Sequence, residues 1–446
     1  MSSRPMPPDA PSRCPVTAAG RTFDPFGADY LQDPYPHLRE IRAQEPVFFS
    51  PDLDYWVVSR YEDVRHCFSN QDDFSARIAL EPIVPPFASS LAIMTKHALA
   101  PVESLVNEDP PLHHLRRKRL ARAFSAPRMK ALEPFVRALA TSYIDRFVQS
   151  GQTDLLASMF HELPALVIFK FFGIPDNEVE TVKAYAGPLA LFIWGRPNEE
   201  EQNHLVGMLG AYAEYSRMHI GRLKASANQS GELSSDYVQA HIEDPDLFPE
   251  SYIADLLPNF LYAGHETTTS QAGNAVRILL ENPQQWTRIC ADAGLIPNAT
   301  EECLRSVSSV IAWRRLTKRA VTVCGVEIPA GSKLLIYNGA ANRDPDVFED
   351  PDIFAIDRDN ARRHLAFGYG AHLCIGAPLA RMEIKVILEE LSRRLPHMKL
   401  VPGQTWSYSA NTSFRGPQRL LVEWDPALNP ILEDRPALRR HPGPKQ

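Results

Sequence analysis

A long, largely apolar stretch between residues 251 and 281 constrains the fold more than any other feature of the sequence. Pro258 is its only early helix breaker, and a helix must begin or kink there because the proline ring removes a backbone hydrogen-bond donor. We therefore expect a central, buried helix of about 25 to 30 residues.

Most of the remaining chain also has a helical pattern. Patterns typical of strands are confined to residues 46–61, 319–340 and 398–424, which is too few for a doubly wound sheet. After Gly376, apolar residues recur at helical spacing, so we expect an amphipathic helix that packs by one face and stops at Pro396. These apolar residues are Ile384, Ile387, Leu388, Leu391 and Leu395. The sequence predicts a mostly α, helix-rich domain with a small β-rich region.

Composition excludes several classes of protein. With 44% apolar and 23% charged residues, the chain resembles neither a disordered nor a fibrous protein. Its net charge of −7 disfavours binding to nucleic acid or to an anionic membrane. No apolar run reaches the roughly 18 to 20 residues of a membrane span, and no signal peptide is evident, so we expect a cytoplasmic protein. We expect residues 1–20 to form a disordered arm, 21–424 the folded domain and 425–446 a proline-rich tail or the start of a linker.

Cys374 is the cysteine most suited to chemistry. The six cysteines include no CxxC pair, which argues against a disulfide framework or a cysteine-rich metal site. Cys374 lies where the loop of residues 364–376 leads into the predicted last helix, and a helix N-terminus favours thiolate over thiol. Glycines around it would let the backbone approach a flat, bulky group, and Phe367 would shield the sulfur. These glycines are Gly368, Gly370 and Gly376. The alternative is a buried structural cysteine at a helix cap.

The segment FGYGAHLCIG, residues 367–376, closely resembles the heme-binding loop of the cytochromes P-450, the heme-thiolate monooxygenases. The resemblance implies a cytochrome P-450 fold and one heme b held through Cys374. It places Phe367, Gly368, His372 and Gly376 around the cofactor. One histidine and one cysteine do not complete a tetrahedral zinc site, so we do not expect zinc at His372.

Two further motifs carry the same resemblance. Glu302 and Arg305 of EECLR would by themselves suggest a solvated surface pair. In the family, this pair and a later arginine form a buried structural triad, which here implies Glu302, Arg305 and Arg358.

The segment AGHETTTS, residues 263–270, lies within the long apolar helix. The Thr267 hydroxyl can bond back to the Ala263 carbonyl and loosen the helix. Taken alone, the segment could equally be a threonine-rich patch packed in a core. The resemblance implies instead that Glu266 and Thr267 deliver protons to dioxygen, and a poorly solvated Glu266 should have a raised pKa.

Heme propionates are carboxylates and require cations or hydrogen-bond donors. The resemblance places four residues in this role: His113, Arg117, Arg314 and His364. We also expect six apolar residues to line a substrate pocket, and these are Ile78, Leu80, Leu261, Ala263, Val310 and Ile311. Ser308 and Ser309 stand where many relatives have prolines, which leaves the shape of that pocket wall open.

The resemblance covers roughly residues 23–424 and is strongest to the heme domains of the bacterial self-sufficient class, in which an FMN and plant-type 2Fe-2S reductase follows. This chain has no CxxxxCxxC cluster ligands, so we expect a separate or fused reductase as electron donor. Residues 113–130 contain seven Lys or Arg and no acid. A solvated helix face is one interpretation of this stretch. We predict that it docks an acidic ferredoxin or flavin domain.

The implied activity is insertion of one oxygen atom of dioxygen into a small apolar or aromatic substrate, as hydroxylation or O-dealkylation, with electrons from NAD(P)H. Two alternatives remain. One is a heme-thiolate peroxygenase, dehydratase or isomerase that does not use dioxygen, and the other is a non-enzymatic heme protein such as a gas sensor or carrier. A proton-delivering acid and alcohol count against both alternatives.

Overall fold

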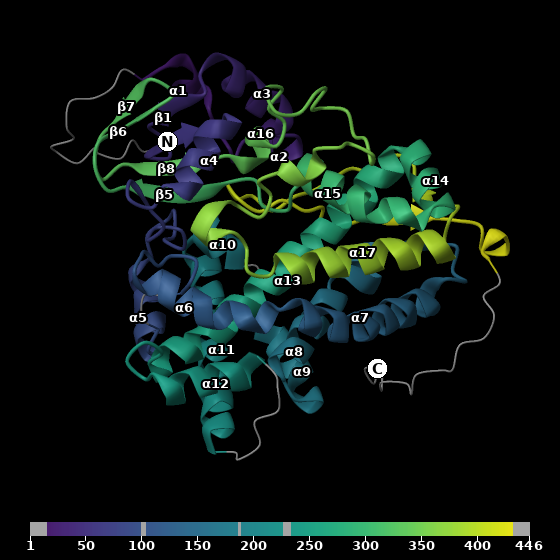
Figure 1. Ribbon diagram of the computed structural model, residues 1–446, viewed down its shortest axis with the longest axis horizontal. Helices are drawn as coiled ribbons and strands as arrows, with labels where there is room; N and C mark the ends of the chain where they lie inside the picture. The colour runs from purple at the N-terminus through teal and green to yellow at the C-terminus, as the bar shows by residue number, and fades with distance from the viewer. Residues whose placement is uncertain (1–15, 100–103, 186–188, 226–232, 431–446) are drawn as a thin grey trace.

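The structure is a computed structural model that describes residues 16–99, 104–185, 189–225 and 233–430. A β-rich region holds the N-terminal helices at one end of the molecule, and the longer helices pack together below it (Figure 1). The described residues therefore form a mostly α domain with small sheets, as the sequence predicts. No helix within the described ranges is long and apolar enough to cross a membrane.

The helices form two groups: short helices in the N-terminal part of the chain, and a bundle that contains the longest helices. The first group comprises α1 (Ala18–Thr22), α2 (Ala28–Gln32), α3 (Tyr35–Gln44), α4 (Tyr61–Ser69), α5 (Ala88–Lys96) and α6 (Leu112–Leu120). The bundle comprises α7 (Ala126–Phe147), α8 (Leu163–Phe172), α9 (Val179–Tyr185), α10 (Leu189–Trp194), α11 (Glu199–Ala225), α12 (Leu233–Glu243), α13 (Glu250–Glu281), α14 (Pro283–Ala291), α15 (Ile296–Ser306) and α17 (Ala377–Arg394). The short helix α16 (Asn338–Ala341) follows the main sheet.

Three small sheets contain the strands. The largest has the order β1-β2-β8-β5-β3, formed by β1 (Val47–Ser50), β2 (Tyr55–Val58), β8 (Lys333–Ile336), β5 (Trp313–Thr317) and β3 (Phe74–Ser75). The second has the order β4-β10-β9, formed by β4 (Gln152–Asp154), β10 (Leu421–Glu423) and β9 (Lys399–Leu400). The third is a hairpin of β6 (Val321–Val323) and β7 (Val326–Ile328). All three predicted β-like stretches contain strands, and the sequence pattern did not indicate three further strands: β3, β4 and β5.

The predicted central helix is α13, which spans 32 residues and continues through Pro258. The proline ring leaves the Ala254 carbonyl without its usual donor four residues later. The Ser216 hydroxyl of α11 donates a hydrogen bond to this carbonyl, and the Asn259 side-chain amide donates to the carbonyl of Asp255 at 2.7 Å. Side chains therefore supply hydrogen bonds to the turn that the proline interrupts, and the helix does not need to begin there.

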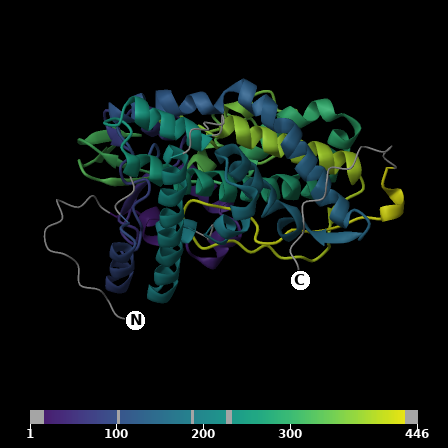
Figure 2. The same ribbon diagram turned by 90° about the horizontal axis from the view of Figure 1, so that it is seen from below.

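The predicted amphipathic helix is α17, which ends at Arg394 with Leu395 as its C-cap. Its five apolar positions are almost completely buried in the largest core cluster, at 1% exposure or less. The helix runs beside α7 in both views (Figures 1 and 2) and also packs against α13 and α15. The residues around Cys374 are thus connected to a rigid, well-packed helix.

The predicted domain ends need one correction. Residues 16 and 17 precede α1, and Gly20 lies so close to β1 that an added Cβ would be 2.2 Å from the Phe49 carbonyl oxygen. Residues 16–20 therefore belong to the folded domain and not to a disordered arm. At the other end, the Asn429 side chain donates to the Val148 carbonyl at 3.1 Å, so residues 425–430 also contact the domain. The remaining parts of both predicted segments, 1–15 and 431–446, lie outside the described residues.

Candidate active site

Cys374 lies between a tight loop and the first turn of α17. Its backbone N–H donates to the Phe367 carbonyl at 2.8 Å, and Gly376 is the N-cap of the helix. Gly370 has a φ of +70°, and an added Cβ would be 3.0 Å from the Ser69 Cα. Only glycine combines this left-handed backbone with so close an approach to α4. The loop conformation therefore depends on the glycine spacing that the sequence shows.

Competing effects set the pKa of the Cys374 thiol. Its surface is accessible to water, but the surrounding protein atoms desolvate the sulfur and raise the pKa of the thiol above its usual value. The N–H groups of Gly376 and Ala377 and the nearby guanidinium groups of Arg117 and Arg381 act in the opposite direction. Coordination to a metal cation would favour the thiolate further, because a coordinating thiol is deprotonated.

A cluster of cations and histidines lies next to Cys374. The rings of His113 and His372 stack with their centroids 4.0 Å apart, and His372 Nδ1 is 3.1 Å from the Leu105 carbonyl oxygen. Both ring nitrogens of His113 and the Nε2 of His372 are buried and have no hydrogen-bond partner in the structure. Arg117 donates to the carbonyl of Leu373, the residue before the cysteine. The buried nitrogens require partners that the protein itself does not provide.

Both histidines are neutral. Burial lowers the pKa of His113 to about 4, with Arg117 adding to the effect. Burial also lowers the pKa of His372 to about 2, and Arg315, His113 and Arg117 contribute. A carboxylate placed among these residues would accept a hydrogen bond from His113 and raise the pKa of His372. The cluster is therefore suited to bind an anion.

Arg315, and not the predicted Arg314, faces this cluster. The two arginines are neighbours on β5, so their side chains point to opposite faces of the sheet. Arg314 donates to the carbonyls of Ala79, at 2.8 Å, and Glu81, and thereby holds the loop after β3. Arg315 is buried, acts on both histidines, and has a pKa lowered to about 10 by burial. The prediction drawn from the resemblance thus selected the wrong one of two adjacent arginines.

His364 was also predicted to contact a propionate, but protein atoms already engage both of its ring nitrogens. The Ala366 N–H donates to Nδ1 at 3.1 Å, so Nε2 carries the proton and donates to Glu301 Oε2 at 3.0 Å. Arg381 donates to both oxygens of the same carboxylate, at 2.8 and 3.0 Å. Burial alone would raise the pKa of Glu301, but these partners lower it to about 2. His364 therefore contributes to loop structure in place of the predicted contact.

The predicted triad is assembled in the structure. Arg305 donates two hydrogen bonds of 2.7 Å to Glu302, and Arg358 Nε donates to Glu302 Oε1 at 3.2 Å. The side chains of Glu302 and Arg305 are fully buried. Arg305 also donates to the carbonyl of Asn342, and Asn342 accepts the Leu365 N–H at 2.6 Å. The triad is thus linked to the start of the cysteine loop.

On the central helix, Glu266 and Thr267 lie one turn beyond Ala263. Burial raises the pKa of Glu266 to about 7, and its Oε2 atom has no hydrogen-bond partner in the structure. The Thr267 hydroxyl donates to the Ala263 carbonyl, as the sequence predicts. Ala263 is exposed although it lies in the middle of the long helix. An exposed alanine at this point indicates an internal space beside α13.

These observations fit a heme. Cys374 is an exposed cysteine, the exposed Ala263 marks open space on α13, and three buried ring nitrogens of His113 and His372 lack partners. Arg117 and Arg315 supply positive charge next to them. Cys374 would hold the iron, and the histidines and arginines would hold the two propionates.

The predicted pocket residues separate into two groups. Leu80 and Val310 belong to an apolar cluster that also contains Tyr262, the residue one turn before Glu266. Ile78 and Ile311 are instead buried in the core beneath the main sheet, at 5% and 3% exposure, so we no longer place them in the pocket. The side chain of Leu261 lies outside the described residues.

Sequence reasoning missed four aromatic residues in the cluster that contains Leu80 and Val310: Trp194, Tyr262, Trp313 and Phe414. The ring centroids of Trp194 and Phe414 are 4.6 Å apart, and those of Tyr262 and Phe414 are 6.0 Å apart. Four separate segments of the chain supply these rings, and no local pattern connects them. We call these four residues, with Leu80 and Val310, the aromatic cluster.

Ser308 and Ser309 have specific partners. The Ser309 N–H donates to Gln271 Oε1 of α13 at 2.8 Å, and the Ser308 hydroxyl donates to the Leu304 carbonyl at 2.6 Å. A proline at position 309 could not make the first bond. Ser309 thus connects the segment after α15 to the central helix, and Ser308 connects it back to α15.

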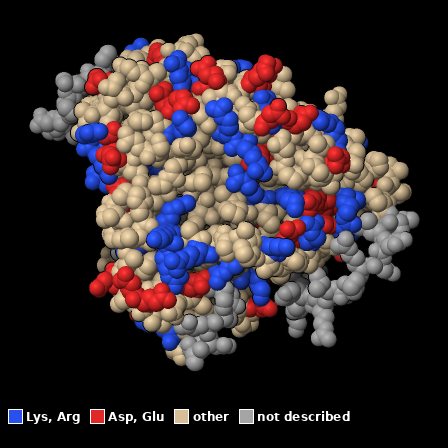
Figure 3. Space-filling view, viewed as in Figure 1, with Lys and Arg blue, Asp and Glu red and all other residues tan. Residues whose placement is uncertain are grey.

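The basic stretch 113–130 is less uniformly exposed than its sequence suggests. Arg116 is buried and pairs with Glu108 at 2.9 Å, Arg119 pairs with Glu243 at 3.2 Å, and Arg128 pairs with Asp236. The exposed cations are Lys118, Arg122 and Lys130. Figure 3 shows Lys and Arg side chains gathered over α6 on this face of the molecule.

Comparisons with known proteins agree with this geometry. The model of the cytochrome P-450 family matches residues 51–402. A beta-dihydromenaquinone-9 omega-hydroxylase of Mycobacterium tuberculosis is 32% identical over 415 residues, which cover 92% of this chain and 79% of that protein. The chain belongs to the cytochrome P-450 family and is a monooxygenase that uses heme b.

Solved structures extend this result. An intact type IV self-sufficient cytochrome P-450 monooxygenase matches with a TM-score of 0.92 and 44% identity, over 94% of this chain and 55% of that chain. The chain thus spans about half the length of that enzyme. The heme domain of a cytochrome P-450 from Tepidiphilus thermophilus matches with a TM-score of 0.89 and 38% identity, over 92% of this chain and 99% of that chain. The predicted similarity to heme domains of the self-sufficient class is confirmed.

We expect Cys374→Ala to abolish the strongly red-shifted Soret band of the reduced carbon monoxide complex, because that band requires a thiolate ligand. Cys324→Ala is a matched control, since Cys324 is also an exposed cysteine and lies in the turn between β6 and β7. Absorption spectra of the reduced proteins with carbon monoxide give the measurement. A normal band in Cys374→Ala would contradict the ligand assignment.

Proposed function

We propose that the chain hydroxylates or O-dealkylates a small apolar or aromatic substrate, with electrons that originate from NAD(P)H and arrive through a ferredoxin or a flavin/2Fe-2S reductase. We also propose a cytoplasmic location. The observation that carries the proposal is the pairing of a buried acid, whose pKa is about 7, with the aromatic cluster one helical turn away.

The aromatic cluster supports a small aromatic or apolar substrate. The Glu266 carboxyl interacts with the backbone of Ala190, a buried residue packed against the aromatic cluster, and with Tyr262, a member of it. Aromatic rings prefer offset or edge-to-face contacts with other rings, and each such pair adds about 0.5 to 1.5 kcal/mol. A flat substrate that reached Ala263 would meet this surface on one side and the acid on the other.

Heme, when bound, supplies the activation of dioxygen, and the residues of the chain hold and deliver protons. Glu266 is about half protonated near pH 7, so it can both accept and release a proton. The Thr267 hydroxyl bonds to the Ala263 carbonyl and must turn away from it to donate elsewhere.

Neither a peroxide-using heme-thiolate enzyme nor a heme sensor or carrier needs protons delivered to dioxygen by Glu266 and Thr267. A peroxide-using enzyme receives its oxygen already reduced, and a heme sensor or carrier releases its ligand unchanged. A buried acid beside an alcohol on the central helix favours dioxygen chemistry over both. Product formation with dioxygen, a surrogate ferredoxin and its reductase tests the choice, and product formed only with added peroxide would overturn it.

We expect Thr267→Ala to divert electrons from product into hydrogen peroxide or water, because protons then arrive at the wrong time. Heme content and substrate binding should stay near normal. Thr268→Val is a matched control, since this neighbouring threonine is buried at 3% exposure. The measurement is product and peroxide formed per NADPH consumed. An unchanged yield in Thr267→Ala would remove the residue from the relay.

The raised pKa of Glu266 predicts a pH dependence. Its carboxyl is protonated below about pH 7 and loses the proton above it, so turnover that requires this proton should fall as the pH rises through 7. Glu266→Gln should be slower and should lose this inflection. The control is Asp255→Asn, because Asp255 lies on the same helix and burial also raises its pKa. A retained inflection in Glu266→Gln would assign the proton to another group.

The electron donor is proposed to dock on the exposed cations beside α6. Arg117 contacts the carbonyl of Leu373, next to the cysteine, so this helix approaches the residues that would hold the heme. Lys118, the next residue, is exposed, and Leu115 is an exposed apolar side chain at 52%. An exposed apolar side chain on the same helix as exposed positive charge suits an acidic partner.

We expect Lys118→Glu to slow heme reduction by an acidic ferredoxin at low salt without changing substrate binding. The difference should shrink as salt increases, because the Debye length falls to about 10 Å at 0.1 M. Lys170→Glu, at an exposed lysine of α8, is the matched control. Stopped-flow reduction rates at several salt concentrations give the answer. Equal rates for Lys118→Glu and the wild type at every salt concentration would refute docking at this position.

A further inference from the structure

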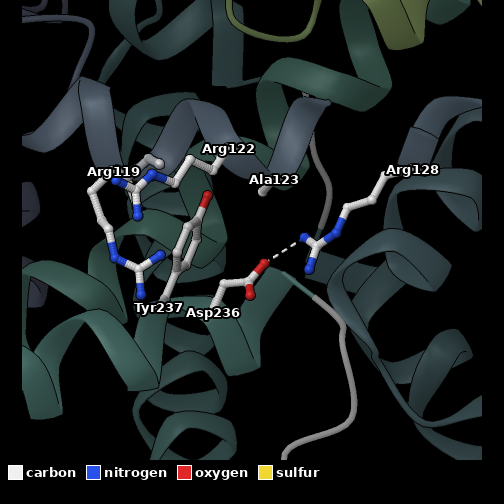
Figure 4. A pocket seen from close by; sticks show the side chains of 7 residues that line it. Arg119, Arg122, Ala123, Arg128, Asp236 and Tyr237 are labelled. Atoms are coloured by element: carbon white, nitrogen blue, oxygen red, sulfur yellow. Dashed lines mark hydrogen bonds and ion pairs between the residues drawn. The ribbon is translucent and has the colours of Figure 1, made fainter. Parts of the chain in front are cut away.

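A small cavity lies between α6, the helical turn after it (η1, Ala121–Phe124) and α12 (Figure 4). Its volume is about 90 Å³, and Arg119, Arg122, Arg128, Asp236 and Tyr237 line it. None of these residues belongs to the proposed heme or substrate site, although Arg122 is one of the exposed cations of the proposed docking surface. Docking does not account for the cavity itself.

The lining carries more positive than negative charge. Arg119 pairs with Glu243 at 3.2 Å, and Arg128 pairs with Asp236, as the dashed line in Figure 4 marks. Within the described ranges, no carboxylate lies within ion-pair distance of Arg122, which is exposed. Three guanidinium groups thus line the cavity with one carboxylate, Asp236. Arg122 acts electrostatically on Glu243, outside the lining, and helps to lower the pKa of that carboxyl, but it makes no ion pair with it.

Tyr237 provides an independent indication of a ligand. The residue is buried at 1% exposure, and its hydroxyl has no hydrogen-bond partner in the structure. Figure 4 shows the hydroxyl pointing toward the turn that carries Arg122 and Ala123. Burial raises the pKa of Tyr237 well above its usual value, so the hydroxyl keeps its proton and is a donor. A buried donor without an acceptor is costly, and an anion in the cavity would supply that acceptor.

We propose that this cavity binds a phosphate-sized oxyanion through the Arg122 guanidinium and the Tyr237 hydroxyl, with Arg119 and Arg128 adding positive charge. The volume exceeds the roughly 30 Å³ share of one water molecule and accommodates a group with several oxygens. Guanidinium groups match the oxygens of phosphate and carboxylate with paired hydrogen bonds. The anion is either free phosphate or the phosphate end of a larger molecule, since both present the same oxygens.

Calorimetric titration of the heme-loaded protein with inorganic phosphate at constant ionic strength tests the proposal. We expect one site in the wild type, with affinity reduced about tenfold or more in Arg122→Gln and in Tyr237→Phe, because each loses a donor to a charged group. Lys130→Gln removes an exposed positive charge that does not line the cavity, and it should bind phosphate as the wild type does. A parallel titration with ribose 5-phosphate identifies the source: equal binding indicates the end of a larger molecule, and weaker binding indicates free phosphate.

Thermal unfolding distinguishes a lost site from a damaged fold. Phosphate should raise the unfolding temperature of the wild type and of Lys130→Gln, but not that of Arg122→Gln, while all variants unfold at similar temperatures without phosphate. The proposal is overturned if millimolar phosphate gives no binding heat in the wild type. It is also overturned if Arg122→Gln and Tyr237→Phe both bind phosphate as the wild type does, or if Lys130→Gln loses as much affinity as Arg122→Gln.

Discussion

The carboxylate of Glu301 holds both ends of the cysteine loop, and the geometry of the site depends on this contact. Its oxygens accept hydrogen bonds from His364, ten residues before Cys374, and from Arg381 in the second turn of α17. The adjacent Glu302 binds Arg305 and Arg358. Two neighbouring acids on α15 therefore fix the loop, the helix that follows it and the segment that precedes it. Separating one of these buried acids from its arginine would leave an uncompensated buried charge, so each pair keeps its two residues in place.

The Glu301 carboxylate does not engage the other two histidines of the site. Glu301 occupies His364, whereas His113 and His372 retain buried nitrogens without acceptors and lie beside two arginines. A protein that binds no anion would have little reason to bury such a cluster, because orphaned polar groups and concentrated positive charge are both unfavourable. The heme propionates would remove both costs, so cofactor binding and the stability of this region are coupled.

The opposite side of the site depends on α13. Pro258 removes one backbone hydrogen bond of this helix, and Ser216 donates to the carbonyl that the proline leaves open, while the Thr267 hydroxyl adds a bond to the Ala263 carbonyl. Gly264 packs so tightly against Ile168 that an added Cβ would be 2.9 Å from its Cδ1 atom. Tight packing before Glu266 and exposure at Ala263 place the acid at the boundary between core and open space. That position accounts for a pKa of about 7.

The sequence by itself determined the features that depend on short spacings: the loop at Cys374, the amphipathic helix α17, the long helix α13 and the Glu302–Arg305 pair. Helical and turn geometry fixes which residues a few positions apart can meet, so these features are visible in a local pattern. Tertiary structure decided what depends on pairing between distant segments. Pairing of β5 with β8 and β3 directs Arg315, and not Arg314, toward His372, and a one-residue offset in a strand reverses the face. The same reason explains why Ile78 and Ile311 lie in the core and why the aromatic cluster could not be predicted: packing of separate segments decides which apolar surfaces meet, and no local spacing encodes it.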